Sequence, residues 1–300
     1  MALDPDYASN QRIYLSFSER DAVDATIDGT TVARARLDPI GLKLTEIQII
    51  YRQSLKMPSG GHYGPRLVFD KNGYLLVTMG ERFQGVFSQD LSKGNGKVVR
   101  ITTQGAAAPG NRLASHATAQ PEIWSYGHRN PQGAALHPVT GALWVSEHGP
   151  QGGDELNLVQ AGKNYGWPVI SWGQEYGTTT QIGEGATKPG MEQPVSYWIT
   201  RDGTAYTAGA KSSIAPSGLA IYSADKFPEY RGNVLMGALA AAALWRVVLA
   251  ADDGKTEVFR ERLLAARNER LRDVRVGPDG WIYLLTDGEN AKLLRIFRQR

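Results

Sequence analysis

The sequence of 300 residues contains no cysteine. This absence excludes disulfide bonds, and it also excludes zinc and iron–sulfur sites with cysteine ligands, while leaving the redox compartment open. The sequence also lacks any apolar run near the roughly 18 residues that a membrane-spanning helix needs. We therefore expect no membrane span.

An excess of one charge is missing as well. The 33 Lys and Arg residues are almost balanced by 30 Asp and Glu residues, and the formal net charge of +3 is not gathered into a basic block. Nucleic-acid-binding proteins usually carry a basic patch or stripe. We therefore expect no nucleic-acid partner.

The first residues, MALDPDYASNQ, lack both the basic segment and the apolar segment of a secretory signal peptide. An exported protein would accordingly have this sequence in a mature or trimmed form.

Glycine and the polar aromatic residues are abundant. There are 34 Gly and 15 Pro residues, and the 20 Trp and Tyr residues together outnumber the seven Phe residues. This composition is typical of short strands joined by tight turns, and less typical of a helical bundle.

Five stretches repeat one pattern, in which a turn leads into a short apolar strand and a second strand follows. The first strands are predicted within 11–19, 72–81, 140–149, 232–240 and 279–289, and the second strands within 31–38, 96–102, 154–160, 243–249 and 291–297. Four of the five second strands place an Arg among apolar residues.

These units favour an all-β β-propeller with variable loops, forming one domain over residues 1–300. Five such units are also compatible with a β-sandwich or two small barrels, but the repeated internal order favours the propeller. Helical periodicity is scarce, and only the segment 256–270 is compatible with a helical turn or two. Little sequence precedes the first unit to pair with the last strand, so we expect either missing N-terminal sequence or a small ring.

His62 lies in a Gly-rich loop, MPSGGHYGP, that leads into an apolar strand. A neutral imidazole can take a proton from a substrate hydroxyl near neutral pH, which makes His62 a candidate general base. The alternative is a histidine that only hydrogen-bonds the carbonyls of its loop.

Arg129 and Asn130 precede a proline in SYGHRNPQG, and the pair Arg270 and Arg272 alternates within NERLRDV. Alternate residues of a strand lie on one face, and guanidinium groups match carboxylates. These residues would suit a ligand with several negative charges. The alternative is a solvated face on which the arginines pair with Glu269 or Asp273.

The stretch EHGPQGGDE, residues 147–155, follows an apolar strand and combines three carboxylates with three glycines. Calcium accepts backbone carbonyls as well as carboxylates, so Gly149, Pro150 and Glu155 are candidate ligands. The spacing is not that of an EF-hand, and a Gly-rich turn with ordinary surface acids is the alternative.

Six motifs together resemble, in order, the glucose/sorbosone dehydrogenase family, and in particular its soluble aldose sugar dehydrogenase branch, which uses pyrroloquinoline quinone (PQQ). The motifs are GGHYGPRLVFD, SYGHRNPQG, SEHGPQGGDELN, GKNYGWP, IAPSG and RLRDVRVGPDG. The resemblance covers nearly the whole chain. It implies a six-bladed β-propeller, here lacking part of its N-terminal blade.

The resemblance also implies a reaction and the residues that perform it. His62 matches the family's catalytic base, which takes the proton of the C1 hydroxyl of an aldose while a hydride passes to PQQ and a lactone forms. Arg129 matches a residue near the reacting carbonyl of the cofactor. The matched cofactor contacts are Arg129, Asn130, Tyr176, Arg270 and Arg272.

Calcium has two places in such relatives. The backbone oxygens of Gly149 and Pro150 match ligands of an ion that polarises the quinone. Glu155 and the backbone of Tyr165 match a second, structural ion.

The chain also departs from the family. It lacks an N-terminal stretch that carries a cofactor-contacting glutamine in relatives, and Ala240–Ala243 stand where some relatives have a lysine. The segment 200–212 resembles an insertion.

The sequence therefore predicts a PQQ- and calcium-dependent aldose dehydrogenase that passes electrons to an acceptor, as a monomer or dimer in the periplasm or outside the cell. One alternative is a non-catalytic propeller, a truncated or decayed relative that binds a sugar or a protein. Another is a lactone-hydrolysing propeller, for which the strand ends carry few inward carboxylates.

Overall fold

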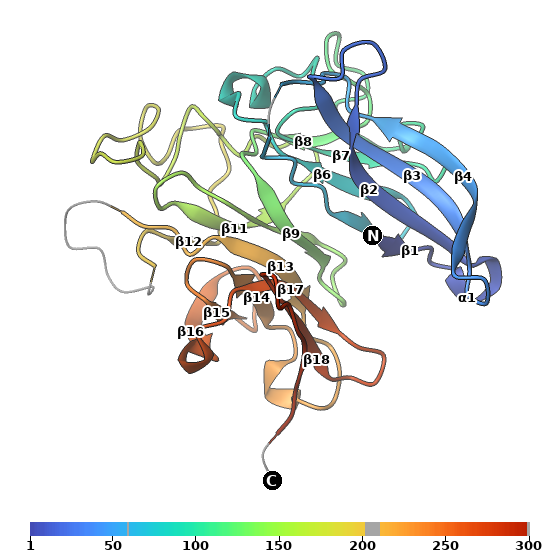
Figure 1. Ribbon diagram of the computed structural model, residues 1–300. Coiled ribbons are helices and arrows are strands. Elements are labelled where there is room, and N and C mark those ends of the chain that lie inside the picture. Colours follow the sequence, from blue (N-terminus) through green and yellow to red (C-terminus); the bar gives the residue numbers. More distant parts are fainter. Residues whose placement is uncertain (59, 202–210, 299–300) are drawn as a thin grey trace. The chain divides into compact units, whose positions relative to one another are not determined.

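The computed structural model describes residues 1–58, 60–201 and 211–298, so most of the segment 200–212 lies outside the described residues. The described residues form five antiparallel sheets with very little helix (Figure 1). They divide into two compact units: unit 1 comprises residues 1–131, 160–168 and 190–192, and unit 2 comprises 132–159, 169–189 and 193–300. The single domain over 1–300 stays a prediction.

Unit 1 contains two four-stranded sheets, each with its strands paired in chain order. The first consists of β1 (Ala2–Leu3), β2 (Arg12–Arg20), β3 (Asp28–Asp38) and β4 (Lys43–Arg52), and the second of β5 (Leu67–Phe69), β6 (Leu75–Met79), β7 (Lys97–Ile101) and β8 (Ile123–Tyr126). The helical turns of this unit are α1 (Tyr7–Asn10) and η1 (Gly85–Ser88).

Unit 2 contains the other three sheets. The first consists of β9 (Pro131–Leu136), whose first residue belongs to unit 1, β10 (Leu143–Glu147), β11 (Asp154–Val159) and β12 (Ser196–Trp198). The second consists of β13 (Pro216–Ile221), β14 (Val234–Ala238), β15 (Ala243–Leu249) and β16 (Glu257–Leu263). The third consists of β17 (Leu271–Val276), β18 (Ile282–Thr286) and β19 (Leu293–Ile296). Two turns of 3-10 helix, η2 (Pro228–Tyr230) and η3 (Ala265–Arg267), complete the unit.

The sheets confirm the five predicted strand pairs. In every sheet one predicted first strand (β2, β6, β10, β14 or β18) is hydrogen-bonded to the second strand that follows it in the sequence. This order is that of β-propeller blades, which confirms the all-β propeller class. Six blades are not confirmed, because the described residues form five sheets, of which the last has three strands.

The segment 256–270 is mostly not helical. Strand β16 takes up seven of its residues, and only the three-residue turn η3 is helical. Pairing of β16 with β15 supplies the backbone hydrogen bonds that an isolated short helix would lack. Among the described residues, no helix is both long enough and apolar enough to cross a membrane.

Two arginines of the predicted second strands each pair with a carboxylate and pack against an aromatic ring. Arg100 of β7 donates to Asp70 (Nε to Oδ2, 2.6 Å) and lies over the ring of Tyr74, whereas Arg246 of β15 donates to Glu261 and lies over the ring of Tyr230. A guanidinium group can be buried when it is paired and its hydrogen bonds are made. Arg100 and Arg246 therefore each tie their strand to neighbouring segments of the same blade.

Each unit has its own core. In unit 1, residues of β2–β7 pack around Tyr14, Leu75 and Val99, all of them fully buried. In unit 2, one cluster surrounds Trp144 and Trp245, and a second contains residues of β17 and β18. These cores hold the strand ends from which the candidate site residues project.

Candidate active site

His62 lies in a loop of unit 1 with a constrained backbone. Both His62 (φ 51°) and Gly64 (φ 62°) have left-handed backbone conformations, which are uncommon for residues other than glycine. The loop passes so close to Gly80 that a Cβ there would lie 2.1 Å from the carbonyl oxygen of His62. Glycine at position 80, directly after β6, therefore permits the position of His62.

A buried arginine anchors this loop. The Arg82 guanidinium donates to the carbonyl oxygens of Gly61 (3.0 Å) and Asp28 (2.9 Å), and it also pairs with the Asp28 carboxylate. It lies 3.8 Å from the centre of the Tyr63 ring, whose hydroxyl donates to Asp28 (2.7 Å). Arg82 and Asp28 therefore contact Gly61 and Tyr63, the two neighbours of His62 in the chain, and these contacts hold the loop in place.

The His62 side chain is oriented by a carboxylate. Its Nδ1 lies 2.9 and 2.8 Å from the two carboxylate oxygens of Glu81, a buried residue that follows Gly80. Since a carboxylate accepts hydrogen bonds, Nδ1 carries the proton and Nε2 has the free lone pair. Nε2 forms no hydrogen bond with a described residue, and the side chain is 11 % exposed. The Phe83 ring packs against the imidazole, with 3.9 Å between ring centres.

Arg129 and Asn130 follow β8, and the structure brings them to the loop that carries His62. The carbonyl oxygen of Arg129 accepts a hydrogen bond from the backbone N–H of Glu81 (2.9 Å). A Cβ on Gly80 would lie 3.2 Å from Oδ1 of Asn130, on the same glycine that contacts His62. The guanidinium of Arg129 lies 5.1 Å from the centre of the Trp167 ring. Tyr165, also in unit 1, packs its ring on that of His128.

In unit 2, the loop after β10 is held by a buried carboxylate, Asp154. Its oxygens accept hydrogen bonds from the backbone N–H groups of Gly149, Ile214 and Ala215 and from the hydroxyl of Ser213. Burial raises the pKa of Asp154 to about 6, although these hydrogen bonds act in the opposite direction. Asp154 therefore joins the loop of Gly149 and Pro150 to the motif IAPSG.

Glu155 is the next residue of β11, and its side chain lies beside another carboxylate. It stands directly opposite Glu147 of β10, and Nδ2 of Asn157 donates to both, at 3.0 and 2.8 Å. Burial and the charge of Glu147 raise the pKa of Glu155. Oδ1 of the fully buried Asn157 has no hydrogen-bond partner among the described residues. Three oxygen-bearing side chains thus gather at one point of the sheet.

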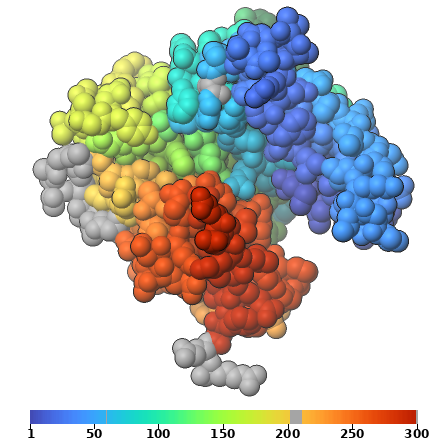
Figure 2. Space-filling model, viewed as in Figure 1, coloured from blue at the N-terminus to red at the C-terminus, as the bar shows by residue number. Residues whose placement is uncertain are grey.

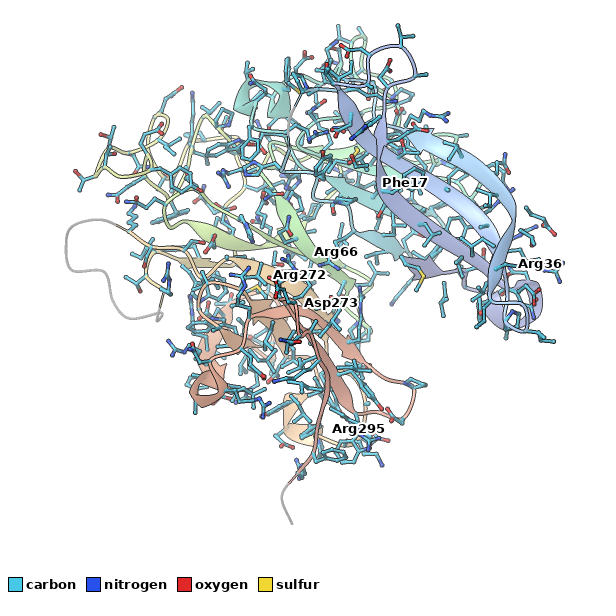
Figure 3. The ribbon with its side chains drawn as sticks, viewed as in Figure 1. Phe17, Arg36, Arg66, Arg272, Asp273 and Arg295 are labelled. Carbon is cyan, nitrogen blue, oxygen red and sulfur yellow. The ribbon has the colours of Figure 1, made fainter. Side chains whose placement is uncertain are left out.

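Arg270 and Arg272 also lie together in unit 2, and their common partner is Asp287. Both guanidinium groups donate to its carboxylate, Arg270 at 2.8 Å and Arg272 at 3.1 Å. Hydrogen bonds from Arg270, and then from Arg272, lower the pKa of Asp287 in spite of its desolvation. The predicted alternative partners, Glu269 and Asp273, pair with other cations instead. Arg272 is labelled in Figure 3.

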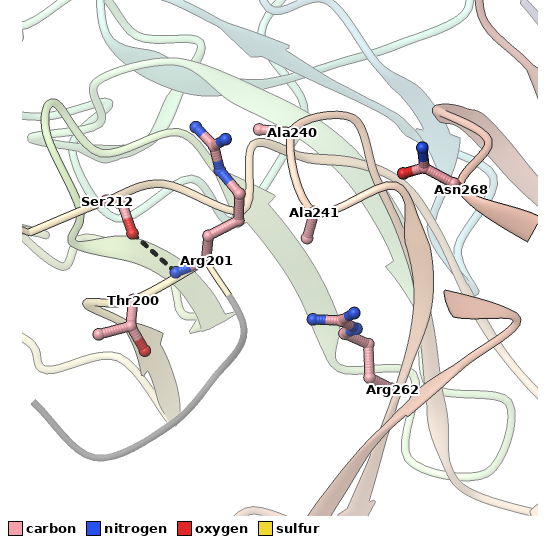
Figure 4. Close-up of a pocket in the computed structure, with 7 residues that line it drawn as sticks. All are labelled: Thr200, Arg201, Ser212, Ala240, Ala241, Arg262 and Asn268. Carbon is pink, nitrogen blue, oxygen red and sulfur yellow. Dashed lines mark hydrogen bonds between the residues drawn. The ribbon is translucent and has the colours of Figure 1, made fainter. Parts of the chain in front are cut away.

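A pocket of about 590 Å³ opens in the same unit (Figure 4). The figure shows the side chains of Arg201 and Arg262 at this pocket, together with Ala240 of the alanine run 240–243. The other lining residues are Thr200, Ser212, Ala241 and Asn268. Among the described lining residues there are two arginines and no carboxylate.

Tyr176, one of the predicted cofactor contacts, is less enclosed than the other predicted residues. Tyr176 is 67 % exposed and forms no hydrogen bond with a described residue.

Within the described ranges, no group of three or more His, Cys, Asp or Glu side chains is placed to hold a metal ion. A calcium ion would therefore need backbone and amide oxygens as well.

Sequence reasoning missed several residues that position the predicted ones. Glu81, Asp154 and Asp287 are separated by 5 to 61 residues from the groups they hold. Glu81 and Asp287 each follow the apolar run of a first strand, and that position is the one signal available in the sequence.

The sequence model of the glucose/sorbosone dehydrogenase family matches residues 1–295. The aldose sugar dehydrogenase YliI of Escherichia coli is 43 % identical over 297 residues, which are 99 % of this chain and 76 % of the relative.

Solved structures are similar as well. The apo-form of the soluble aldose sugar dehydrogenase from Escherichia coli matches with a TM-score of 0.87 and 43 % identity, over 98 % of this chain and 80 % of that chain. The PQQ-bound aldose sugar dehydrogenase from Streptomyces coelicolor matches with a TM-score of 0.74 and 28 % identity, over 98 % and 77 %. The chain therefore belongs to the glucose/sorbosone dehydrogenase family and is a sugar dehydrogenase of that family.

Proposed function

We propose that this protein oxidises the C1 hydroxyl of aldose sugars to lactones with PQQ as its redox cofactor, assisted by calcium. The observation that carries the proposal is the His62–Glu81 pair, in which a buried carboxylate fixes the imidazole and leaves Nε2 available. The family membership and the PQQ-bound relative support the choice of cofactor.

His62 acts as the general base. Its Nε2 takes the proton of the C1 hydroxyl, and the positive charge that develops on the ring is stabilised by Glu81 at Nδ1. The low exposure of both side chains keeps water from competing for this contact. The anchor formed by Arg82 and Asp28 holds the loop, so the base keeps its position during proton transfer.

The charged groups of the chain fit PQQ, which carries three carboxylates. Arg270 and Arg272 share the single carboxylate of Asp287, so this cluster retains one positive charge. Charge-assisted hydrogen bonds from arginine are the expected means of holding such a ligand. Bound PQQ supplies the acceptor for the hydride that leaves C1. Arg129, Asn130 and Tyr176 are the further residues proposed to bind it.

The oxygen atoms of unit 2 fit calcium. The carbonyl oxygen of Pro150 belongs to a buried residue and accepts no hydrogen bond from a described residue. At β11, Glu155, Glu147 and the unpartnered Oδ1 of Asn157 are hard oxygen ligands of the type that calcium prefers. We propose that Gly149 and Pro150 hold one ion and Glu155 another. The backbone of Tyr165 stays a predicted ligand.

The direct test is reconstitution with PQQ and calcium, followed by glucose-dependent reduction of an artificial electron-accepting dye. Turnover that requires PQQ, calcium and the sugar would support the proposal. A protein that binds PQQ in an absorbance titration and yet oxidises none of a panel of aldoses would contradict it. A periplasmic or extracellular location, a physiological electron acceptor, and a monomeric or dimeric state remain predictions from the resemblance.

A further inference from the structure

A small pocket of about 190 Å³ lies in the first sheet of unit 1 and plays no part in the proposed reaction. It is formed by strands β2, β3 and β4, and the hairpin that contains β3 and β4 is coloured blue in the space-filling view (Figure 2). The lining residues are Arg12, Arg34, Ala35, Arg36, Glu46 and Gln48. Three of the six are therefore arginines.

The strand register places these arginines on one face of the sheet. Arg12 of β2 stands directly opposite Arg36 of β3, and Tyr14 stands opposite Arg34. Residues two apart on a strand share a face, as do residues directly opposite. Like charges directly opposite each other destabilise a sheet. The arrangement is thus unfavourable unless an anion is close.

The hydrogen bonds of the arginines leave much of this charge uncompensated. Arg34 donates to neutral groups, the carbonyl oxygen of Thr103 (3.1 Å) and the side chain of Gln48 (2.6 Å), which hold its guanidinium in place. Arg36 pairs with Glu46 at 3.5 Å, and both side chains are more than half exposed. Such exposed pairs contribute little.

The backbone N–H of Arg12 donates to Asn10 (2.8 Å), but its side chain forms no hydrogen bond or ion pair with a described residue. A further carboxylate that Arg12 influences is that of Asp4, which already accepts hydrogen bonds from Asn10, from the backbone N–H of Asp6 and from Tyr14. Burial acts to raise the pKa of Asp4, but these hydrogen bonds and the field of Arg12 lower it overall. The three guanidinium groups of the lining therefore face one carboxylate within the pocket, that of Glu46.

Strand β4 contains a β-bulge at this pocket. Arg34 pairs with Gln48 and Arg36 with Thr45, so an additional residue is inserted in β4 between these pairs. Glu46, within this bulge, has a left-handed backbone (φ 51°). Bulges redirect side chains and interrupt pairing, and they recur beside functional sites. Here the bulge sets the only carboxylate of the lining beside Arg36, which Figure 3 labels on this sheet.

We propose that this pocket binds a phosphate group, as free inorganic phosphate or as a small soluble phosphate ester. Guanidinium groups match phosphate oxygens through paired, charge-assisted hydrogen bonds, and three arginines can serve the several oxygens of one tetrahedral anion. The volume exceeds the roughly 30 Å³ of a water molecule several times, yet it is below the roughly 300 Å³ of common ligand pockets. The pocket therefore suits a phosphate group better than a whole sugar.

The test is a phosphate titration of the full chain, measured by calorimetry and by the shift in Tm, against sodium chloride at equal ionic strength. Phosphate binds the unmodified protein and raises its Tm, whereas chloride does not. Arg12→Gln weakens phosphate binding about 10-fold or more, because one charge-assisted contact is lost. Arg20→Gln, an exposed arginine at the other end of β2, serves as the matched control and leaves binding unchanged.

A second variant gives a change in the opposite direction. Glu46→Gln removes the carboxylate of the lining, so it strengthens phosphate binding while the protein stays folded. Equal phosphate responses of the unmodified protein, Arg12→Gln and Arg20→Gln would overturn the proposal, as would chloride acting as well as phosphate. Binding to vesicles that contain phosphatidic acid, without binding of free phosphate, would also overturn it, because a membrane surface would then be the ligand.

Discussion

The loop of His62 and the ends of strands β10 and β11 both contain charged side chains with low exposure. Opposite charges are paired in the first region, whereas like charges lie opposite each other in the second. At His62, each polar group contacts a complementary one: imidazole with Glu81, and Arg82 with Asp28. At β11, two carboxylates, Glu147 and Glu155, face each other, and no described lysine or arginine forms an ion pair with Glu155. The first region is organised before any ligand binds, whereas we propose that a cation completes the second. Five predictions test this difference, from the largest expected effect to the smallest.

Replacing the base has the largest effect. We expect His62→Gln to lower kcat about 10²- to 10⁴-fold, the usual contribution of a general base, with PQQ affinity nearly unchanged. Dye-reduction kinetics and a PQQ titration measure the two quantities. His116→Gln, an exposed histidine of the same unit, is the control. Equal losses of turnover and of PQQ binding would mean that His62 has a structural role.

Replacing the carboxylate that orients the base has a smaller effect on the same step. We expect Glu81→Gln to lower kcat about 10²-fold, because a neutral amide neither fixes the Nδ1–H tautomer nor stabilises a charged imidazole. The limb of the kcat–pH profile that reports deprotonation of the base should shift to lower pH, since the carboxylate charge that favours protonation of His62 is removed. An unchanged profile would show that Glu81 only fills space beside the ring.

Asp154 and Glu155 are neighbours in β11, and we expect their substitutions to change stability in opposite directions. Asp154→Asn loses acceptor capacity for the N–H groups of Gly149, Ile214 and Ala215. We expect it to lower the free energy of unfolding by about 2–3 kcal/mol. Urea unfolding at pH 7.5 measures this, with the exposed Asp252→Asn as control. A loss no larger than that of the control would contradict the anchoring role.

Glu155→Gln removes a buried charge that faces Glu147. In the absence of calcium, we expect it to raise the free energy of unfolding by about 1 kcal/mol at pH 8, because the mutual repulsion and the desolvated charge disappear. The exposed Glu175→Gln is the control. Stabilisation by calcium should be much weaker in Glu155→Gln than in the control. Unchanged calcium stabilisation would show that Glu155 binds no ion.

The same pair predicts a pH dependence. The pKa of Glu155 in the folded protein is raised above its ordinary value of 4.5, by burial and by Glu147. Its contribution to stability is therefore complete below that value and is lost as the pH rises through the raised pKa. Unfolding of the calcium-free protein at several pH values measures this loss, which calcium should reverse.

The strands could be predicted from the sequence because their signals are local. The runs within 72–81 and 279–289 are apolar, follow turn residues and have the length of a strand, and they became β6 and β18. The segment 256–270 was ambiguous because its apolar residues suit neither period clearly. Part of this segment forms strand β16 because it pairs with the neighbouring strand β15.

The candidate site was only partly predictable for the same reason. Motifs identified His62, Arg129 and the arginine pair, since unusual residue types within Gly-rich loops are visible in a sequence. Glu81 and Asp287 have no such signal, because an acidic residue after a strand is common on protein surfaces. Only the approach of one loop to another shows that Glu81 holds His62 and that Asp287 holds both arginines.

The sequence by itself determined the all-β class, the five strand pairs and the family, and it pointed to His62 and the arginines as candidate site residues. The tertiary structure decided which charges are compensated: His62 by Glu81, the loop of Gly149 by Asp154, and Glu155 by no described cation. The physical reason is that residue type and period are carried by neighbours in the chain, whereas compensation depends on distance through space and on burial. Distance through space and burial both depend on contacts between residues far apart in the sequence.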